Sequence, residues 1–196
     1  MPEQDAVFVC TGGMTNANMQ IPLDAVWDIL LPAMQPTSLP TDDTAHAKLT
    51  QTLANLTRTP QASSVAPPAE HMKKFVFAEN DRKLESIELK RDDKSGDTLL
   101  TVRAGGLEQR IDCGKDAWKK GIVTWGALKD HPIAASGGWT AADTFKAQLC
   151  FCRREFTITL TLAFSGNEVS YSTETYPTKD TTKPKALVGK IPDFPR

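Results

Sequence analysis

The chain has 196 residues, of which 40% are hydrophobic and 24% are charged, a composition typical of a folded, water-soluble protein with one ordinary domain and an appendage. Its formal net charge of −1 argues against a nucleic-acid partner, because proteins that bind polyanions carry a basic face. The longest apolar run near the start, residues 26–34, contains Asp28 and Pro32 and is far shorter than the roughly 20 residues of a membrane-spanning helix. We therefore expect no nucleic-acid partner and no membrane span, and residues 1–5 lack the basic start of a signal peptide.

The N-terminal part predicts one strand and one helix. Residues 6–10 form a continuous apolar run, typical of a strand that is buried on both faces of a sheet. In residues 21–31 the apolar side chains recur at helical spacing, Pro22 suits the first helical position, and Pro32 is expected to end the helix. This pattern predicts a terminal β-α remnant that lacks the rest of its sheet.

A helix between two linkers follows. Residues 35–40 contain two prolines, and residues 61–69 are rich in Ser, Ala and Pro, so both segments are expected to be linkers. Between them, Asp42 suits a helix N-cap, and three leucines at helical spacing predict an apolar stripe: Leu49, Leu53 and Leu56. We accordingly divide the chain into a strand and helix (1–35), a helical linker (36–71) and a β domain (72–196).

From residue 72 onward the pattern is that of strands. Short runs separated by turns such as 92–97 and 105–106, at roughly 8–12-residue spacing, are typical of an antiparallel barrel or sandwich. Expected strands lie at residues 75–77, 84–90, 98–102, 107–111 and 187–191, with edge or corner segments at 118–125 and 134–139. With the meander described next, this predicts a mainly β fold of about eight to ten strands, lipocalin-like in outline and able to close on itself.

The most regular stretch runs from residue 145 to residue 171. Apolar side chains take every even position in one segment: Phe156, Ile158, Leu160, Leu162 and Phe164. This is the period of a strand with one buried face, and burying these five side chains contributes roughly 8–15 kcal/mol before entropy. Residues 145–152 alternate in the same way, and a further turn leads to 168–171, which predicts a three-stranded antiparallel meander.

Catalytic motifs are hard to find in this chain. His46, His71 and His131 are too far apart in the sequence to suggest a metal site, and the acidic residues fall in turns. There is no G-x-S-x-G, H-E-x-x-H or P-loop motif. Cys150 and Cys152 have neither redox nor zinc spacing, so we expect thiols with a structural role. We predict no catalytic residue, no metal and no cofactor.

The one unusual composition in the β domain is three tryptophans among glycines. Trp118, Trp125 and Trp139 lie near Gly114, Gly121, Gly137 and Gly138. Indole rings and small residues could line the mouth of a ligand site, which makes the three tryptophans candidate ligand-lining residues. Alternatively, the rings plug the ends of the barrel and the glycines sit at tight corners.

Two parts of the chain resemble a known family. Residues 5–13, followed by 22–34, are similar to the last strand and C-terminal helix of the bacterial serine β-lactamase-like hydrolases, which include penicillin-binding-protein-related esterases and peptidases. Residues 112–114 with Trp118, and residues 134–139, 151–164 and 187–189, resemble the β-rich C-terminal domain that follows the hydrolase domain in some of these proteins.

The catalytic parts of that family are missing here. No serine has a lysine three positions on, neither Tyr171 nor Tyr176 has an asparagine two positions on, and Cys10 takes the place of the Lys or His before Thr-Gly. Acyl transfer needs an activated serine and an oxyanion hole, and the family's route to both is absent. The resemblance thus implies a non-catalytic accessory domain, and it implies export to the cell envelope.

Two functions remain open at this point. In the first, the β domain shapes or stabilises an upstream hydrolase domain, which is then its partner. This function also predicts that Val7, Phe8 and Val9 pack onto the barrel or pair with a second copy, because such apolar surface rarely stays exposed. In the second, the barrel binds a small molecule or a cell-wall fragment through its tryptophans, which requires an open, apolar interior.

Overall fold

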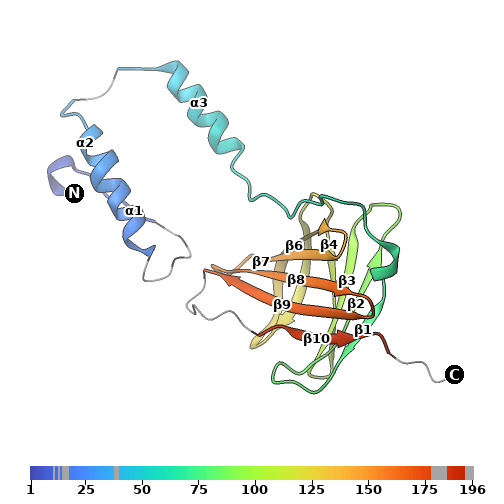
Figure 1. The fold of residues 1–196 in the computed structure, drawn as a ribbon. Helices are drawn as coiled ribbons and strands as arrows, with labels where there is room; N and C mark the ends of the chain where they lie inside the picture. Colours follow the sequence, from blue (N-terminus) through green and yellow to red (C-terminus); the bar gives the residue numbers. More distant parts are fainter. Residues whose placement is uncertain (11, 13, 15–17, 38–39, 178–184, 193–196) are drawn as a thin grey trace. The chain divides into compact units, whose positions relative to one another are not determined.

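The computed structural model describes residues 1–10, 12, 14, 18–37, 40–177 and 185–192. The chain divides into two compact units, Met1–Thr59 and Pro60–Arg196. Helices make up the first unit, and every strand that the structure describes belongs to the second (Figure 1). The boundary between these two units lies at residue 59, and the expected three-part division of the chain stays a prediction.

The first helix of the N-terminal unit is longer than expected. It runs through α1 (Gln20–Ala25), the π-helical η3 (Val26–Leu30) and α2 (Leu31–Ala33), after the short 3₁₀ turn η1 (Pro2–Gln4). Pro32 does not end it: the N–H of Leu31 donates to the carbonyl of Val26, five residues back. Because Pro32 has no N–H and its ring would clash with a carbonyl in an α turn, the wider π turn lets the helix continue past it.

The second helix, α3 (Asp43–Ala54), begins where the sequence indicates. The carboxylate of Asp42 accepts a hydrogen bond from the N–H of Ala45 at 2.9 Å, as an N-cap residue does. No residue of α3 is buried, and the side chains of the expected leucine stripe are exposed. No side chain of α3 is therefore buried in a core, so packing in a core does not stabilise this helix.

The strand expected at residues 6–10 is not formed. This segment has no ladder partner among the residues described, and Val7 and Val9 are 88% and 76% exposed. An isolated strand leaves its backbone groups unpaired, so the apolar run alone cannot make a sheet. Pairing of this segment with a second copy stays a prediction.

The second unit is a ten-stranded antiparallel sheet that curls into a nearly closed barrel, which confirms the mainly β fold. The short 3₁₀ turn η4 (Ala69–His71) precedes it. Its strands are β1 (Lys74–Phe77), β2 (Leu84–Arg91), β3 (Thr98–Ala104), β4 (Leu107–Cys113), β5 (Lys119–Trp125), β6 (Leu128–Ala141), β7 (Thr144–Phe151), β8 (Thr157–Ser165), β9 (Glu168–Tyr176) and β10 (Leu187–Lys190).

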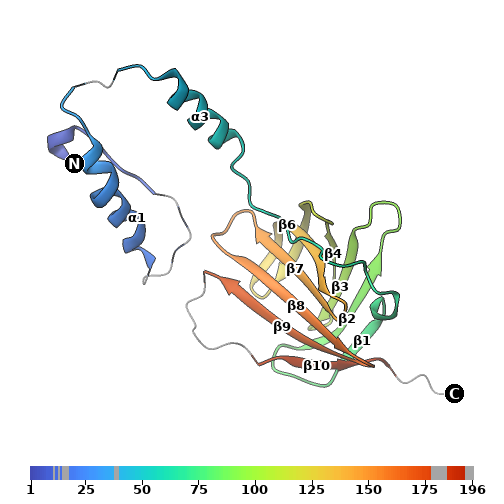
Figure 2. The same ribbon diagram turned by 45° about the horizontal axis from the view of Figure 1, so that its top comes forward.

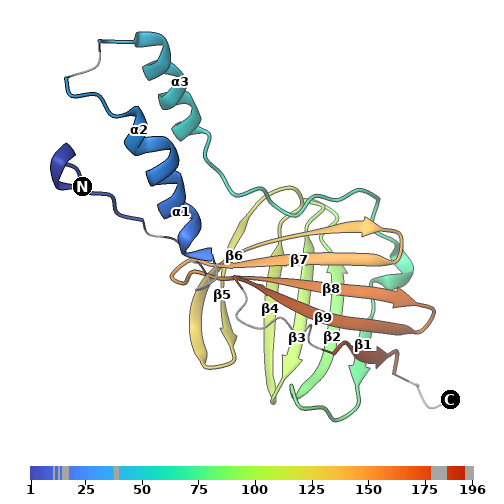
Figure 3. The same cartoon turned by 60° about the vertical axis from the view of Figure 1, so that its left-hand side comes forward.

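The strand order is β4-β3-β2-β1-β10-β9-β8-β7-β6-β5, so every neighbouring pair except the β1–β10 pair joins consecutive strands. Figures 2 and 3 show β7, β8 and β9 on one side of the barrel, crossing β2, β3 and β4 on the other. The inward side chains of both sides form one apolar core.

The predicted meander of β7, β8 and β9 is confirmed. Phe145 pairs with Leu162, and Leu162 pairs in turn with Tyr171, so the alternating apolar residues of all three strands meet on the inner face. Phe156 is the exception: it precedes β8, is only half-buried, and lies with its ring centroid 4.6 Å from that of Phe151.

The barrel closes between β4 and β5, the first and last strands of the order, through two sets of local contacts. Just past β4, Gly114 forms a parallel bridge with Ser136 of β6, and its carbonyl accepts a hydrogen bond from Gly137 N–H at 3.0 Å. At the far end of β4, the side-chain oxygen of Gln109 accepts from the N–H of Thr124, 3.1 Å away in β5. Thr124 lies at a β-bulge, so its N–H is left for this contact.

Residues 61–65, which we call the strap, lie along the part of β6 that β5 does not cover. Gln61 N–H donates to Ser136 Oγ at 2.9 Å, Trp139 N–H donates to Ser63 Oγ at 2.8 Å, and Ser64 N–H donates to the carbonyl of Trp139 at 2.7 Å. The expected linker thus belongs to the barrel unit, because its backbone satisfies the exposed edge of β6.

Candidate functional site

The two ends of the barrel differ in how they are filled. Next to the β6–β7 and β8–β9 turns, Trp139, Phe145 and Phe164 pack against one another, with the ring centroid of Trp139 5.5 Å from Phe145 and 5.4 Å from Phe164. His71 stacks on Phe164 at 4.5 Å. All three larger rings are at most 5% exposed, so aromatic side chains fill this end, which we call the plugged end.

The opposite end, next to the β1–β2, β3–β4 and β5–β6 turns, contains a cavity of about 270 Å³. We call it the mouth cavity. Side chains from β2, β3, β4, β5 and β9 surround it, together with two turn residues. Its lining consists of Arg82, Leu84, Val102, Ala104, Leu107, Gln109, Thr124, Trp125, Gly126, Tyr171 and Thr173.

Arg82 is the only lining residue of the mouth cavity that is ionised at neutral pH. Its Nη2 donates to the carbonyl of Lys185 at 2.8 Å, whereas its Nη1 is buried and has no hydrogen-bond partner in the part of the chain that the structure describes. The turn that carries it is held by Asn80, whose side chain bonds Leu84 N–H at 3.1 Å and the Leu84 carbonyl at 2.8 Å.

Tyr171 lies on the wall of the same cavity. Burial raises its pKa to about 12, and the nearby charge of Arg82 opposes that rise. The phenol therefore stays protonated at neutral pH and offers the cavity a neutral hydroxyl group rather than a second charge.

The three candidate tryptophans are not brought together. Trp125 lines the mouth cavity, Trp139 is 1% exposed in the plugged end, and Trp118 is not part of the cavity lining. Gly137 explains how the plugged end packs, because an added Cβ there would come within 2.7 Å of the ring of Phe145. Trp125 thus lines a cavity, Trp139 is buried in the plugged end, and a role of any tryptophan in ligand binding stays a prediction.

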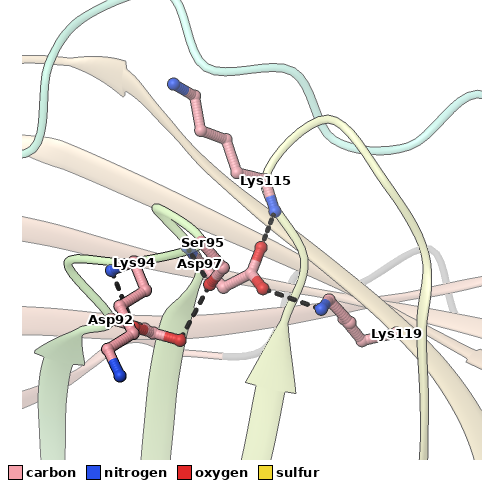
Figure 4. Close-up of polar contacts among 6 residues, drawn as sticks. All are labelled: Asp92, Lys94, Ser95, Asp97, Lys115 and Lys119. Atoms are coloured by element: carbon pink, nitrogen blue, oxygen red, sulfur yellow. Dashed lines mark hydrogen bonds and ion pairs between the residues drawn. The ribbon is translucent and has the colours of Figure 1, made fainter.

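A charged cluster lies beyond the plugged end, at the β2–β3 turn. The carboxylate of Asp97 accepts from the N–H of Lys115 at 2.8 Å and pairs with the ammonium of Lys119 at 2.9 Å (Figure 4). Partial burial by itself raises the pKa of Asp97, but the hydrogen bonds from Lys115 and Lys119 outweigh it and hold the pKa below its usual value. We call this contact the Asp97 clasp; it ties β3 to the segment between β4 and β5.

The described residues hold no candidate metal site. Across the described ranges, no three His, Cys, Asp or Glu side chains lie close enough together to hold a metal ion. His46 is on exposed α3, and His131 lies beside Phe151 with 5.6 Å between ring centroids. The four cysteines are free thiols, and burial raises the pKa of Cys113 far above its ordinary value.

No helix in the described part of the chain combines the length and the apolar character needed to span a bilayer. A scan against models of protein families finds no match for the chain, and a search of curated proteins finds none either.

The sequence predicted Trp125 as a lining residue but missed Arg82. Arg82 lies in a turn among other charged residues, Asp81 and Lys83, where a solvated side chain is the ordinary expectation. Only the strand order brings it next to β9 and β10, far away in the sequence.

Proposed function

We propose that the barrel binds a small, largely apolar molecule in the mouth cavity. The observation that carries this proposal is a concave, mostly apolar site with a few polar groups, as ligand sites in barrels usually are. Leu84, Val102 and Trp125 supply apolar walls, while Gln109 and Tyr171 supply hydrogen-bonding groups. The plugged end makes this a one-mouthed pocket rather than a channel.

The volume of the cavity limits the ligand. At about 30 Å³ per water in the liquid, 270 Å³ corresponds to roughly nine water-sized groups. A molecule of about that many non-hydrogen atoms, such as octan-1-ol, is therefore the first neutral probe to use.

The experiment is a calorimetric titration of the full chain with octan-1-ol. Ala104, on the cavity wall at the end of β3, is replaced by Phe so that the ring occupies the cavity. Ala163→Phe, the same substitution at an exposed position of β8, is the matched control. We expect binding by the original chain and by Ala163→Phe, with at least a tenfold loss in Ala104→Phe because a filled pocket excludes the ligand.

Two results would contradict this proposal. One is equal binding of octan-1-ol by Ala104→Phe and Ala163→Phe, because the ligand would then bind outside the mouth cavity. The other is no binding by the original chain while near-ultraviolet circular dichroism confirms that the barrel is folded.

A second candidate function is that of a non-catalytic accessory domain of a serine β-lactamase-like hydrolase. Its support is the apolar surface of the N-terminal unit: Trp27 is 50% exposed and Ile29 is 71% exposed, and only Val26 is buried in that helix. Apolar side chains gathered in this way are typical of protein interfaces. The resemblance of residues 22–34 to the last helix of that family makes the hydrolase domain the expected partner.

This second candidate predicts association with a separately produced hydrolase domain of that family, measured by sedimentation. Trp27→Ala should weaken the association about tenfold or more, since aromatic anchors dominate interfaces, whereas Asp28→Ala on the same helix should have little effect. If the chain alone hydrolyses an ester or a lactam, and one substitution in the barrel abolishes this activity, the second candidate function is wrong.

A further inference from the structure

We propose that the ligand of the mouth cavity carries an anionic head group, in the manner of a medium-chain alkyl carboxylate, and that Arg82 binds that group. This inference rests on the proposed function, because it names the chemical class of molecule that the same cavity takes.

The first argument is the unsatisfied donor of Arg82. One terminal nitrogen of the guanidinium is engaged by the carbonyl of Lys185, while Nη1 is buried with no partner in the described part of the chain. A buried charged donor without an acceptor is costly, so a ligand that supplies the acceptor gains affinity. The guanidinium is a planar set of five N–H donors, and its fork matches the two oxygens of a carboxylate.

The second argument is the charge around Arg82. None of the other ten lining residues is acidic, and Arg82 takes part in no ion pair that the structure describes. The neighbouring Glu85 is already engaged by Arg103 at 2.8 Å and by the N–H of Gly106. Within the described residues, no carboxylate of the lining and no ion pair engages Arg82, and its positive charge extends to the wall, where it opposes the rise in the pKa of Tyr171.

The third argument is that the cavity lining offers one charged group together with apolar side chains. Arg82 comes from the β1–β2 turn at the mouth, and the apolar side chains of Leu84 and Val102 come from the strands. An alkyl chain can pack on these apolar side chains, while an anionic head group can accept from the guanidinium of Arg82. A molecule with one anionic end and a short apolar tail satisfies both kinds of lining group at once.

The test compares three probes with tails of equal length: octanoate, octan-1-ol and octylammonium. Each is titrated by calorimetry into the full chain, the Arg82→Gln variant and the Arg110→Gln variant. Arg110 lies on β4 with an exposed side chain, so its replacement removes the same charge away from the cavity and serves as the matched control.

For the original chain we expect octanoate to bind best and octylammonium worst. Arg82→Gln should lower octanoate affinity about tenfold to a hundredfold and leave octan-1-ol affinity unchanged, because a charge-assisted hydrogen bond has that effect. Arg110→Gln should change none of the three affinities. Arg82→Lys, which keeps the charge but not the fork, should retain part of the preference for octanoate, and it replaces Arg82→Gln if the latter does not fold.

The outcomes separate the two proposals. If octan-1-ol binds in the cavity but octanoate binds no better, or if Arg82→Gln and Arg82→Lys leave octanoate affinity unchanged, the inference about the head group is wrong and the proposed function stands. If neither octanoate nor octan-1-ol binds, the proposed function fails as well.

Discussion

Single residues explain how each end of the barrel is built. At the plugged end, the missing side chain of Gly137 leaves room for the ring of Phe145 and for Cys113, which would lie 2.7 and 2.8 Å from an added Cβ. At the other end, the β-bulge at Thr124 precedes Trp125, and a bulge changes the direction in which a strand presents its side chains. One end is therefore closed by packing, and the other keeps a cavity.

The packing at Gly137 can be tested by adding one methyl group. Gly137→Ala should lower the free energy of unfolding by about 1–3 kcal/mol, because the crowded core must shift to accept it. Gly121→Ala in β5 is the control, since an added Cβ there meets only Ile133 Cγ1 at 4.0 Å. Urea unfolding of both variants measures the difference, and equal stabilities would contradict the account of the plugged end.

The Asp97 clasp should make stability depend on pH. The pKa of Asp97 is lowered in the folded state, so the clasp contributes stability above the ordinary pKa of an aspartate, about 3.9, and loses it as the pH falls through the folded value. Asp97→Asn should therefore have a lower urea midpoint than the original chain at neutral pH. The gap should close in acid; a gap that persists unchanged below about pH 2 would rule out the ionised carboxylate as its source.

At the scale of elements, the strap replaces a neighbouring strand along part of β6. Ser63 Oγ accepts a hydrogen bond from the N–H of Trp139, which lies beyond Ala135, the last residue of β6 that pairs with β5. Ser63→Ala leaves this N–H without that acceptor, so we expect the free energy of unfolding to fall by about 1–2 kcal/mol. Ser64→Ala is the control, because Ser64 contacts β6 through its backbone N–H. Identical thermal midpoints would show that the strap only lies on the surface.

The strands could be predicted because their pattern is local. In β7 and β8, apolar residues alternate with polar ones, and the period of two is enough to define the strand and its buried face. The expected strand at residues 6–10 was wrong because a strand also needs a partner, which the pattern of one segment cannot supply. The helix that passes Pro32 was missed because the π turn depends on backbone geometry rather than on composition.

At the scale of the whole molecule, the candidate site depends on long-range pairing. The mouth cavity joins Arg82 from the β1–β2 turn with Tyr171 from β9, which lie near each other only because β1 and β9 both pair with β10. Composition indicated tryptophans as ligand-lining residues, yet it could not separate Trp125 at the cavity from Trp139 in the plug. Those two roles follow from the register of β5 and β6.

The central claim is that the barrel takes its ligand through the mouth cavity, and nuclear magnetic resonance of the full ¹⁵N-labelled chain titrated with octan-1-ol tests it most directly. We predict that the amide signals of Leu84, Val102 and Thr124 and the indole signal of Trp125 shift together and saturate. The indole signal of Trp139 should stay in place, because the plugged end is filled. Shifts confined to the plugged end or to residues 1–59, or no shifts at all, would contradict the account.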